Sequence, residues 1–244
     1  MSTPSRVATI AAGLGFSAAA ACALGPAAIQ IGVVDPMAGF GIFALGLLLA
    51  LLALLVGGLG LWRTRAAAGR FGRGRAVVGA CLGFVILAIV MRTLAFAGNP
   101  PRINDITTDP EDPPAFVAAQ KIAANRGRDL VYPGETFASQ QREGYPDLAS
   151  IRLSDPPDAA FARAERAATA LNWDITVRDP TTGVFEAVEV TRIFRFVDDI
   201  VVRVRTSSTG GGSVIDVRSK SRDGKGDIGA NAARIRAFRD ALSR

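Results

Sequence analysis

Histidine is absent from this chain of 244 residues. Without imidazole, the Ser-His-Asp and Cys-His nucleophilic arrangements, the histidine-based zinc and iron sites and a histidine general base are all excluded. The two cysteines, Cys22 and Cys81, both fall in long apolar runs. The rest of the chain therefore has no disulfide, thiolate nucleophile or cysteine metal site. Gly210–Gly212 lacks the lysine and the following helix of a phosphate-binding loop, so carboxylates and arginines are the groups left for chemistry.

Acidic residues are almost missing from the first hundred positions, where Asp35 is the only one. Seven arginines in the same stretch carry the whole formal charge of +6, while the remaining residues hold 21 basic and 21 acidic side chains. The sequence pI of about 10.1 therefore does not indicate nucleic-acid binding, because the polar part of the chain is neutral.

Three long apolar runs occupy residues 7–34, 38–62 and 76–98. A span across a hydrocarbon core of roughly 30 Å needs about 20 apolar residues, so residues 1–99 are predicted to form a membrane anchor of three transmembrane helices. For the first run a cleaved signal peptide is the alternative, since small residues flank Cys22 late in the run.

The loop Arg63–Arg75 sets the predicted orientation. It holds five arginines in thirteen residues between two spans, which places it in the cytoplasm by the positive-inside rule. Residues 100–244 then lie on the outer side. We therefore expect a multi-pass protein of the bacterial inner membrane with a periplasmic C-terminal domain.

Residues 100–157 are rich in Pro and Asp, which prevents long helices and sheet interiors. The stretch is either a linker or a strap laid over a domain, and its embedded apolar residues favour the strap. A short helix from Pro114 to about Asn125 is expected within it.

From Asp158 the pattern is regular, with a helix, four strands and a final helix. Residues 158–244 are therefore predicted to form an α+β domain, a two-layer sandwich of an antiparallel sheet of about four strands with the helices on one face. In the last hairpin, Ile200, Val202 and Val204 share one face. The opposite face is charged and is expected to be either a solvated outer surface or a ligand platform; it carries Arg203, Arg205, Asp216, Arg218 and Lys220. Because neighbouring strand residues point to opposite faces, Asp198 and Asp199 are not expected to act as a pair.

The final helix is predicted to begin after Asp227, whose carboxylate suits the free N–H groups of a first turn. Its apolar face comprises Ile228, Ala232, Ile235, Phe238 and Leu242. Four polar residues are expected to converge there, either as a polar lock between loop and helix or as a site for a small anion: Arg222, Asp227, Asn231 and Arg234.

Five blocks of sequence carry a resemblance: Asp198–Arg203, Asp216–Arg222, Asp227–Ile235, Ile103–Asp109 and Pro113–Phe116. The first three resemble the domain of unknown function 1499 family, and the last two resemble the opening of that family. The resemblance covers residues 102–244. It implies an α+β domain found in bacterial envelope proteins and in photosynthetic organelles, and it assigns no catalytic residue.

These observations favour an exported domain that binds or scaffolds in the cell envelope without catalysis, with the lipid bilayer and an envelope protein or small anionic ligand as partners. The predicted ligand-binding residues are Arg203, Asp216, Arg218, Arg222, Asp227, Asn231 and Arg234, and no cofactor, metal or nucleic acid is expected. A carboxylate-dependent envelope hydrolase is the alternative, using for instance Asp216 with Asp198 or Asp227. A purely structural role, with the spans as the working part, is a third.

Overall fold

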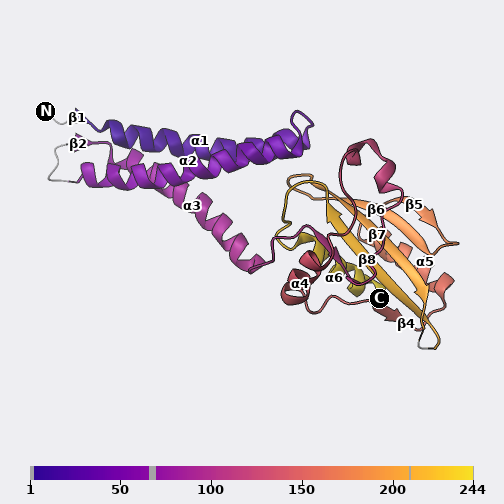
Figure 1. The fold of residues 1–244 in the computed structure, drawn as a ribbon. Coiled ribbons are helices and arrows are strands. Elements are labelled where there is room, and N and C mark those ends of the chain that lie inside the picture. The colour runs from indigo at the N-terminus through magenta and orange to yellow at the C-terminus, as the bar shows by residue number, and fades with distance from the viewer. Residues whose placement is uncertain (1–2, 66–69, 209, 244) are drawn as a thin grey trace. The chain divides into compact units, whose positions relative to one another are not determined.

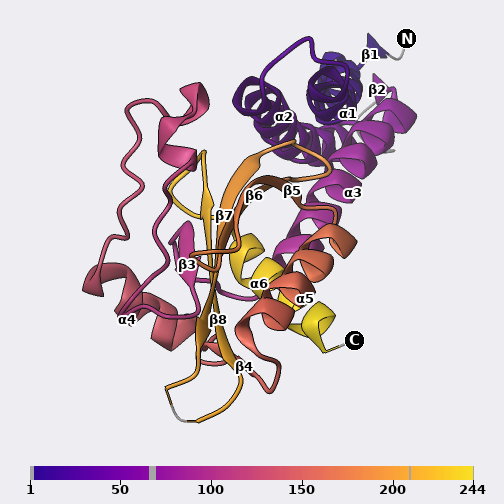
Figure 2. The same cartoon turned by 90° about the vertical axis from the view of Figure 1, so that its right-hand side faces the viewer.

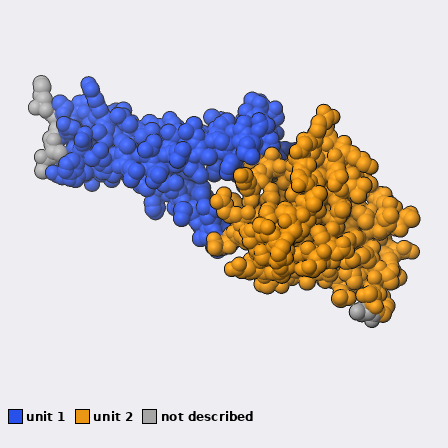
Figure 3. Space-filling model, viewed as in Figure 1, with its two compact units in different colours: residues 1–98, 192–195 blue, residues 99–191, 196–244 orange. Residues whose placement is uncertain are grey.

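A computed structural model describes residues 3–65, 70–208 and 210–243. The gaps fall in the arginine-rich loop and in the turn of the last hairpin, so the predictions for residues 66–69 and 209 lie outside the described residues. The chain forms two compact units, residues 1–98 with 192–195 and residues 99–191 with 196–244 (Figure 3).

The first unit is built from three long helices, α1 (Arg6–Gln30), α2 (Pro36–Arg63) and α3 (Arg73–Ala97) (Figure 1). Ser5 and Asp35 begin the first two helices, and each side chain accepts a hydrogen bond from a first-turn N–H group. The short strands β1 (Thr3–Pro4) and β2 (Arg70–Phe71) pair in parallel. At 1.5 Å per residue the 25 to 28 residues of each helix extend about 38–42 Å. All three helices are long and apolar enough to cross a membrane, as the sequence predicts.

Glycine lets the three helices approach closely. A Cβ atom on Gly79 would lie 2.3 Å from the carbonyl oxygen of Ala11, and one on Gly83 would lie 2.3 Å from that of Ala50. Small residues at helix contacts are the usual way in which membrane helices pack, because lipid supplies no hydrophobic drive between them. Larger side chains such as Leu48, Leu55 and Ile89 point outward.

The second unit is organised by an antiparallel sheet with the strand order β3-β8-β7-β6-β5, with β4 also paired to β8. The predicted strands are β5 (Asp174–Asp179), β6 (Val184–Val190), β7 (Val197–Thr206) and β8 (Ser213–Ser221). Two three-residue strands, β3 (Asp105–Thr107) and β4 (Ile151–Leu153), raise the expected four strands to six. The predicted α+β class with a largely antiparallel sheet is confirmed.

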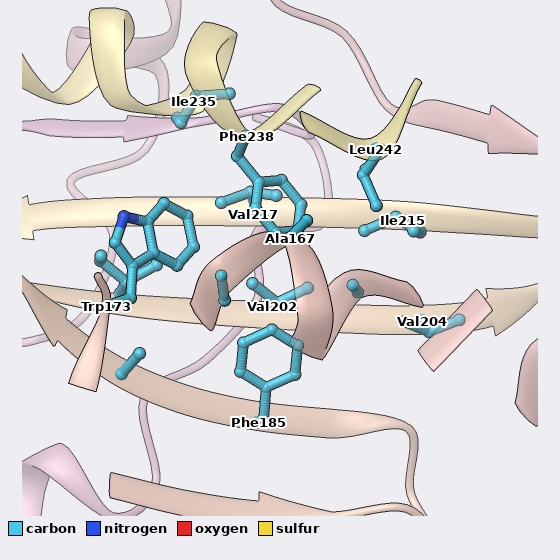
Figure 4. Packing of buried hydrophobic residues seen from close by; sticks show 14 of the residues in the cluster. Ala167, Trp173, Phe185, Val202, Val204, Ile215, Val217, Ile235, Phe238 and Leu242 are labelled. Carbon is cyan, nitrogen blue, oxygen red and sulfur yellow. The ribbon is translucent and has the colours of Figure 1, made fainter. Parts of the chain in front are cut away.

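Helices α5 (Pro157–Ala170) and α6 (Ala230–Leu242) cover one side of the sheet, which we call the helix face (Figure 2). The predicted apolar stripe of β7 packs there with Ile215 and Val217 of β8 (Figure 4). Trp173 stacks on Phe238 with ring centroids 5.0 Å apart. Burial of each large apolar side chain contributes about 1.5–3 kcal/mol, so this layer holds the domain together.

Residues 100–157 form a strap that packs on the sheet. Ile103, Ile106, Tyr145 and Leu148 enter the main core. The chain between β3 and α4 (Glu135–Gly144) covers the other side of the sheet, here called the strap face (Figure 2). A second small core lies beneath it, comprising Phe116, Ala119, Leu130 and Val201.

The helix expected over residues 114–125 is wrong. This stretch forms two short 3₁₀ turns instead, η2 (Ala119–Lys121) and η3 (Ala123–Asn125). The Glu186 carboxylate binds three consecutive backbone N–H groups at residues 117–119, which fixes this backbone to β6. Ile122, with φ of −77° and ψ of 148°, is extended and separates the two turns.

The start of the last helix also differs from the prediction. The helix begins at Ala230, after Gly229 in a left-handed conformation, rather than directly after Asp227. Ile228 is consequently not part of its buried face. That side chain is 60% exposed and its φ of +52° lies in the left-handed region.

Candidate functional site

The predicted site residues lie in two groups, because β7 and β8 present alternate side chains to opposite faces of the sheet. Ile200 and Val202 of β7, with Ser219 of β8, face the helices. Arg203 of β7 and Arg218 of β8 face the strap.

Arg234 of α6 is the centre of the helix-face group. Its guanidinium donates to Asp198 at 2.5 Å, to the Asn231 side-chain oxygen at 2.6 Å and to the Ser219 hydroxyl at 2.9 Å. It also donates to Glu189 of β6. Arg234 is only 7% exposed, so these bonds form a closed lock between helix and sheet.

Asp227 and Asn231 complete this lock. The Asp227 carboxylate accepts the backbone N–H groups of Gly229 at 2.9 Å and Asn231 at 2.8 Å, as a helix-capping group does. Burial raises the pKa of Asp227. The Asn231 amide donates to the Ser221 hydroxyl at 2.9 Å. Arg234, Asn231 and Asp227 therefore converge as expected from their spacing.

Arg222 does not join them. Its guanidinium turns to the strap face and binds Asp199 through Nη2 at 2.7 Å and through Nε at 3.1 Å. Arg128 and Asn125 of the strap bind the same carboxylate. The chain turns directly after β8, so the four-residue convergence expected from sequence proximity is wrong for Arg222.

Arg218 and Asp105 form the deepest charge pair of the strap face. Nε and Nη2 of Arg218 each lie 2.8 Å from a different oxygen of Asp105, and Lys220 reaches the same carboxylate at 2.8 Å. The guanidinium also binds the carbonyl oxygens of Pro114 and Leu130. It lies 4.8 Å from the centre of the Phe116 ring and 5.4 Å from that of Tyr132.

Asp216 occupies the other end of this face. Its carboxylate is fully buried and accepts from Arg203 at 3.1 Å, from Arg205 at 2.5 Å and from the Ser150 hydroxyl at 2.5 Å. Asp109 and Asp112 of the strap pair with the same two arginines.

The charged face of the hairpin is therefore not the outer surface that its alternation predicts. Arg218 is 2% exposed because the strap covers it and neutralises it with Asp105. In the structure Arg203 pairs with Asp216, and Arg218 pairs with Asp105 of the strap. Ligand binding by these residues stays a prediction.

Sequence reasoning did not identify Asp105, Arg128, Glu186 or Asn125 as members of these clusters. Glu186 is 3% exposed, and its two oxygens accept three backbone N–H groups of the strap at 2.5–2.8 Å. The partners are 67 to 113 residues apart in the chain, so no local pattern could join them. Glu186 lies between Phe185 and Ala187 in β6, and an acid flanked by apolar residues was the available signal.

The arrangement limits the chemistry of the domain. Asp216 and Asp198 lie on opposite faces of the sheet, each held by arginine. Among the described residues there is no group of three or more side chains suited to hold a metal ion. Hollows of about 530 and 730 Å³ lie on the two flanks of α5, and one of about 300 Å³ lies beside Pro100. A further hollow of about 340 Å³ lies on the strap face, where Arg218 and Tyr132 contribute to its lining.

Comparison with known proteins places this fold in one family. A family model described as protein of unknown function (DUF1499) matches residues 105–242, from the first residue of β3 to the last of α6. This is more than half of the chain. No curated protein matches the sequence.

Proposed function

Since the chain belongs to the DUF1499 family of proteins of unknown function, we propose that it is an inner-membrane protein of a bacterial envelope that works by binding rather than by catalysis. Its α+β domain lies on the periplasmic side and holds or scaffolds an envelope partner.

The membrane part of this proposal rests on the three apolar helices and on the charge of their connection. The loop between α2 and α3 is rich in arginine, and such loops stay in the cytoplasm. Helix α3 then leads outward and ends at Ala97, only a few residues before the domain. A C-terminal tag reachable by a membrane-impermeant reagent in intact cells is the expected result. A tag that becomes reachable only after lysis would overturn the orientation.

One observation carries the non-catalytic part. The buried carboxylates of both sheet faces are already neutralised inside the domain, Asp105, Asp198, Asp199 and Asp216 by arginine and Glu186 by backbone N–H groups. A general acid-base pair needs two carboxyl groups that reach a substrate. The described hollows contain no such pair.

The surface of α5 is the part best suited to a partner. Hollows of about 530 and 730 Å³ flank the helix, and Arg166 lines both of them. This side chain is exposed and forms no ion pair with a described residue, unlike Arg163 with Asp155 and Arg178 with Glu165. The free guanidinium between two hollows fits an acidic segment of an envelope protein.

A photo-crosslinking residue at position 170 tests this surface in intact membranes and leaves Arg166 in place, because Ala170 is exposed and lines both hollows. Position 152 is the control, since Arg152 is exposed and without an ion pair to a described residue but lies on β4. We expect a discrete adduct from position 170 that added salt or Arg166→Glu weakens, and none from position 152. Equal, diffuse labelling from both positions would rule out α5 as the docking surface.

A further inference from the structure

The loop between β8 and α6 lies beside the point where the domain leaves the anchor. Its residues Lys225, Gly226 and Ile228 line a hollow of about 300 Å³ together with Pro100, Pro101 and Arg102. The Asn104 side-chain amide donates to the Gly224 carbonyl at 2.7 Å, and the Ser221 N–H donates to the Asn104 carbonyl at 2.9 Å. These bonds hold the loop against residues 100–104.

Chain length places this hollow near the end of α3. Pro100 follows the last residue of that helix, Ala97, by three positions, so the two are at most about 11 Å apart along an extended chain. The headgroup region of a bilayer adds roughly 5–8 Å on each side of the hydrocarbon core. If α3 spans the membrane, the hollow therefore lies at the level of the lipid headgroups or next to it.

Two cations lie at the rim of the hollow, unpaired within the described part of the chain. Arg102 and Lys225 are exposed and form no ion pair with a described residue, whereas most arginines of the domain are paired. One exposed acid, Asp223, lies on the same loop, and the Asp227 carboxylate is turned to backbone N–H groups. The rim thus keeps two cations that the domain itself does not neutralise.

Ile228 is the second independent observation. Its side chain is 60% exposed beside the two cations, and its φ of +52° is a conformation that β-branched residues adopt only under strain. Exposure of this apolar side chain to water gives no stabilisation that would offset the backbone strain. An apolar side chain with cations around it is the combination that interfacial segments use to enter the headgroup layer.

We propose that the loop 222–228 is a membrane-docking element, in which Ile228 enters the headgroup layer of an anionic bilayer while Arg102 and Lys225 bind lipid phosphates. The proposal rests on the proposed function in one respect, namely that α3 spans the membrane. It would hold the domain against the bilayer surface at a fixed point beyond the tether at residues 98–100.

The test uses the full chain in nanodiscs, with Cys22→Ala and Cys81→Ala as background. An environment-sensitive fluorophore is attached at Ile228→Cys or, as the matched control, at Val131→Cys, since Val131 is an exposed apolar residue of the strap. The nanodiscs contain phosphatidylcholine alone or a mixture with phosphatidylglycerol. A lipid carrying a headgroup quencher reports contact.

We expect the label at position 228 to be quenched several-fold more than that at position 131 in anionic nanodiscs, and less so without phosphatidylglycerol or at high salt. The double variant Arg102→Glu/Lys225→Glu should remove this difference. The variant Lys121→Glu/Arg126→Glu, which makes the same charge change at exposed positions of the strap, should keep it. Equal quenching at both positions, or quenching that survives charge reversal of Arg102 and Lys225, would overturn the proposal.

The result for the docking element can be distinguished from the results that test the proposed function. Accessibility of a C-terminal tag reports the orientation of the chain, and crosslinking from α5 reports the partner. A protein with an outward domain whose label at position 228 stays in water would refute the docking element alone.

Discussion

Arg218 and Asp105 share two hydrogen bonds of 2.8 Å across 113 residues of sequence, with both side chains buried. This pair joins the strap to β8 of the sheet. Its environment includes Lys220 on the same carboxylate and two aromatic rings on the guanidinium.

Replacement of Asp105 by Asn should destabilise the domain strongly. The change leaves Arg218 and Lys220 as buried cations without a counter-charge, which costs about 3–5 kcal/mol. Thermal unfolding of the full chain in detergent, followed by circular dichroism, measures the effect. Glu143→Gln is the control, because Glu143 is exposed and forms no ion pair with a described residue; its effect should stay within about 0.5 kcal/mol. Similar midpoints for the two variants would contradict the role given to the pair.

Replacement of Glu186 by Gln should loosen the strap locally. The carboxylate accepts three backbone N–H groups, whereas an amide offers only one oxygen, so at least one buried donor loses its partner at about 1–3 kcal/mol. Hydrogen exchange at residues 117–119 should become faster. Glu189→Gln, on the opposite face of the same strand, removes a bond to Arg234 and should leave exchange at 117–119 unchanged.

The two tyrosines of the chain should ionise together, at a pH well above the usual value for a tyrosine. Burial raises the pKa of Tyr132 and of Tyr145 from 10.0 to about 12. The negative charge of Asp105 adds to the increase for Tyr132, and that of Asp227 adds to the increase for Tyr145. Their hydroxyls have no hydrogen-bond partner among the described residues. Because the folded-state pKa is raised, the stabilising contribution is complete below pH 10 and is lost as the pH rises through about 12.

Ultraviolet difference spectra measure this titration directly. The folded chain should show almost no tyrosinate at pH 10, whereas the chain unfolded in denaturant should be half ionised there. Tyr132→Phe should remove one of the two late steps. A native titration that follows the denatured curve would show that the hydroxyls reach water.

Packing of the three helices should depend on one glycine far more than on another. A Cβ atom on Gly83 would lie 2.3 Å from the Ala50 carbonyl oxygen and 2.8 Å from the Leu54 nitrogen. Gly83→Ala should therefore cost about 1–3 kcal/mol in thermal stability of the purified protein in detergent. At Gly58 a Cβ meets nothing within 4 Å, so Gly58→Ala should be neutral or stabilising.

Local periodicity predicted the parts of the fold that depend on neighbouring residues. The three apolar helices, the hairpin of β7 and β8 and the inward stripe at Ile200 and Val202 all follow from spacing alone. The same alternation separated Asp198 from Asp199, and the structure places them on opposite faces.

Partners distant in sequence could not be predicted in this way. Strands β3 and β4 have three residues each and exist only because β8 offers both of them an edge. The charged face of the hairpin has the pattern of a solvated surface, since alternation cannot distinguish a face covered by water from one covered by a strap. The ion pair between Arg218 and Asp105 shows that the strap covers this face. No residue near either of them in the sequence predicts the pair.

The position of β8 has a consequence for biosynthesis. This strand pairs with β3, β4 and β7, yet it begins at Ser213, after all three of them in the chain. Until β8 has been synthesised, Asp105 lacks its counter-ions Arg218 and Lys220, and β3 and β4 have no strand to pair with. The strap can therefore take its place on the sheet only after β8 has been made.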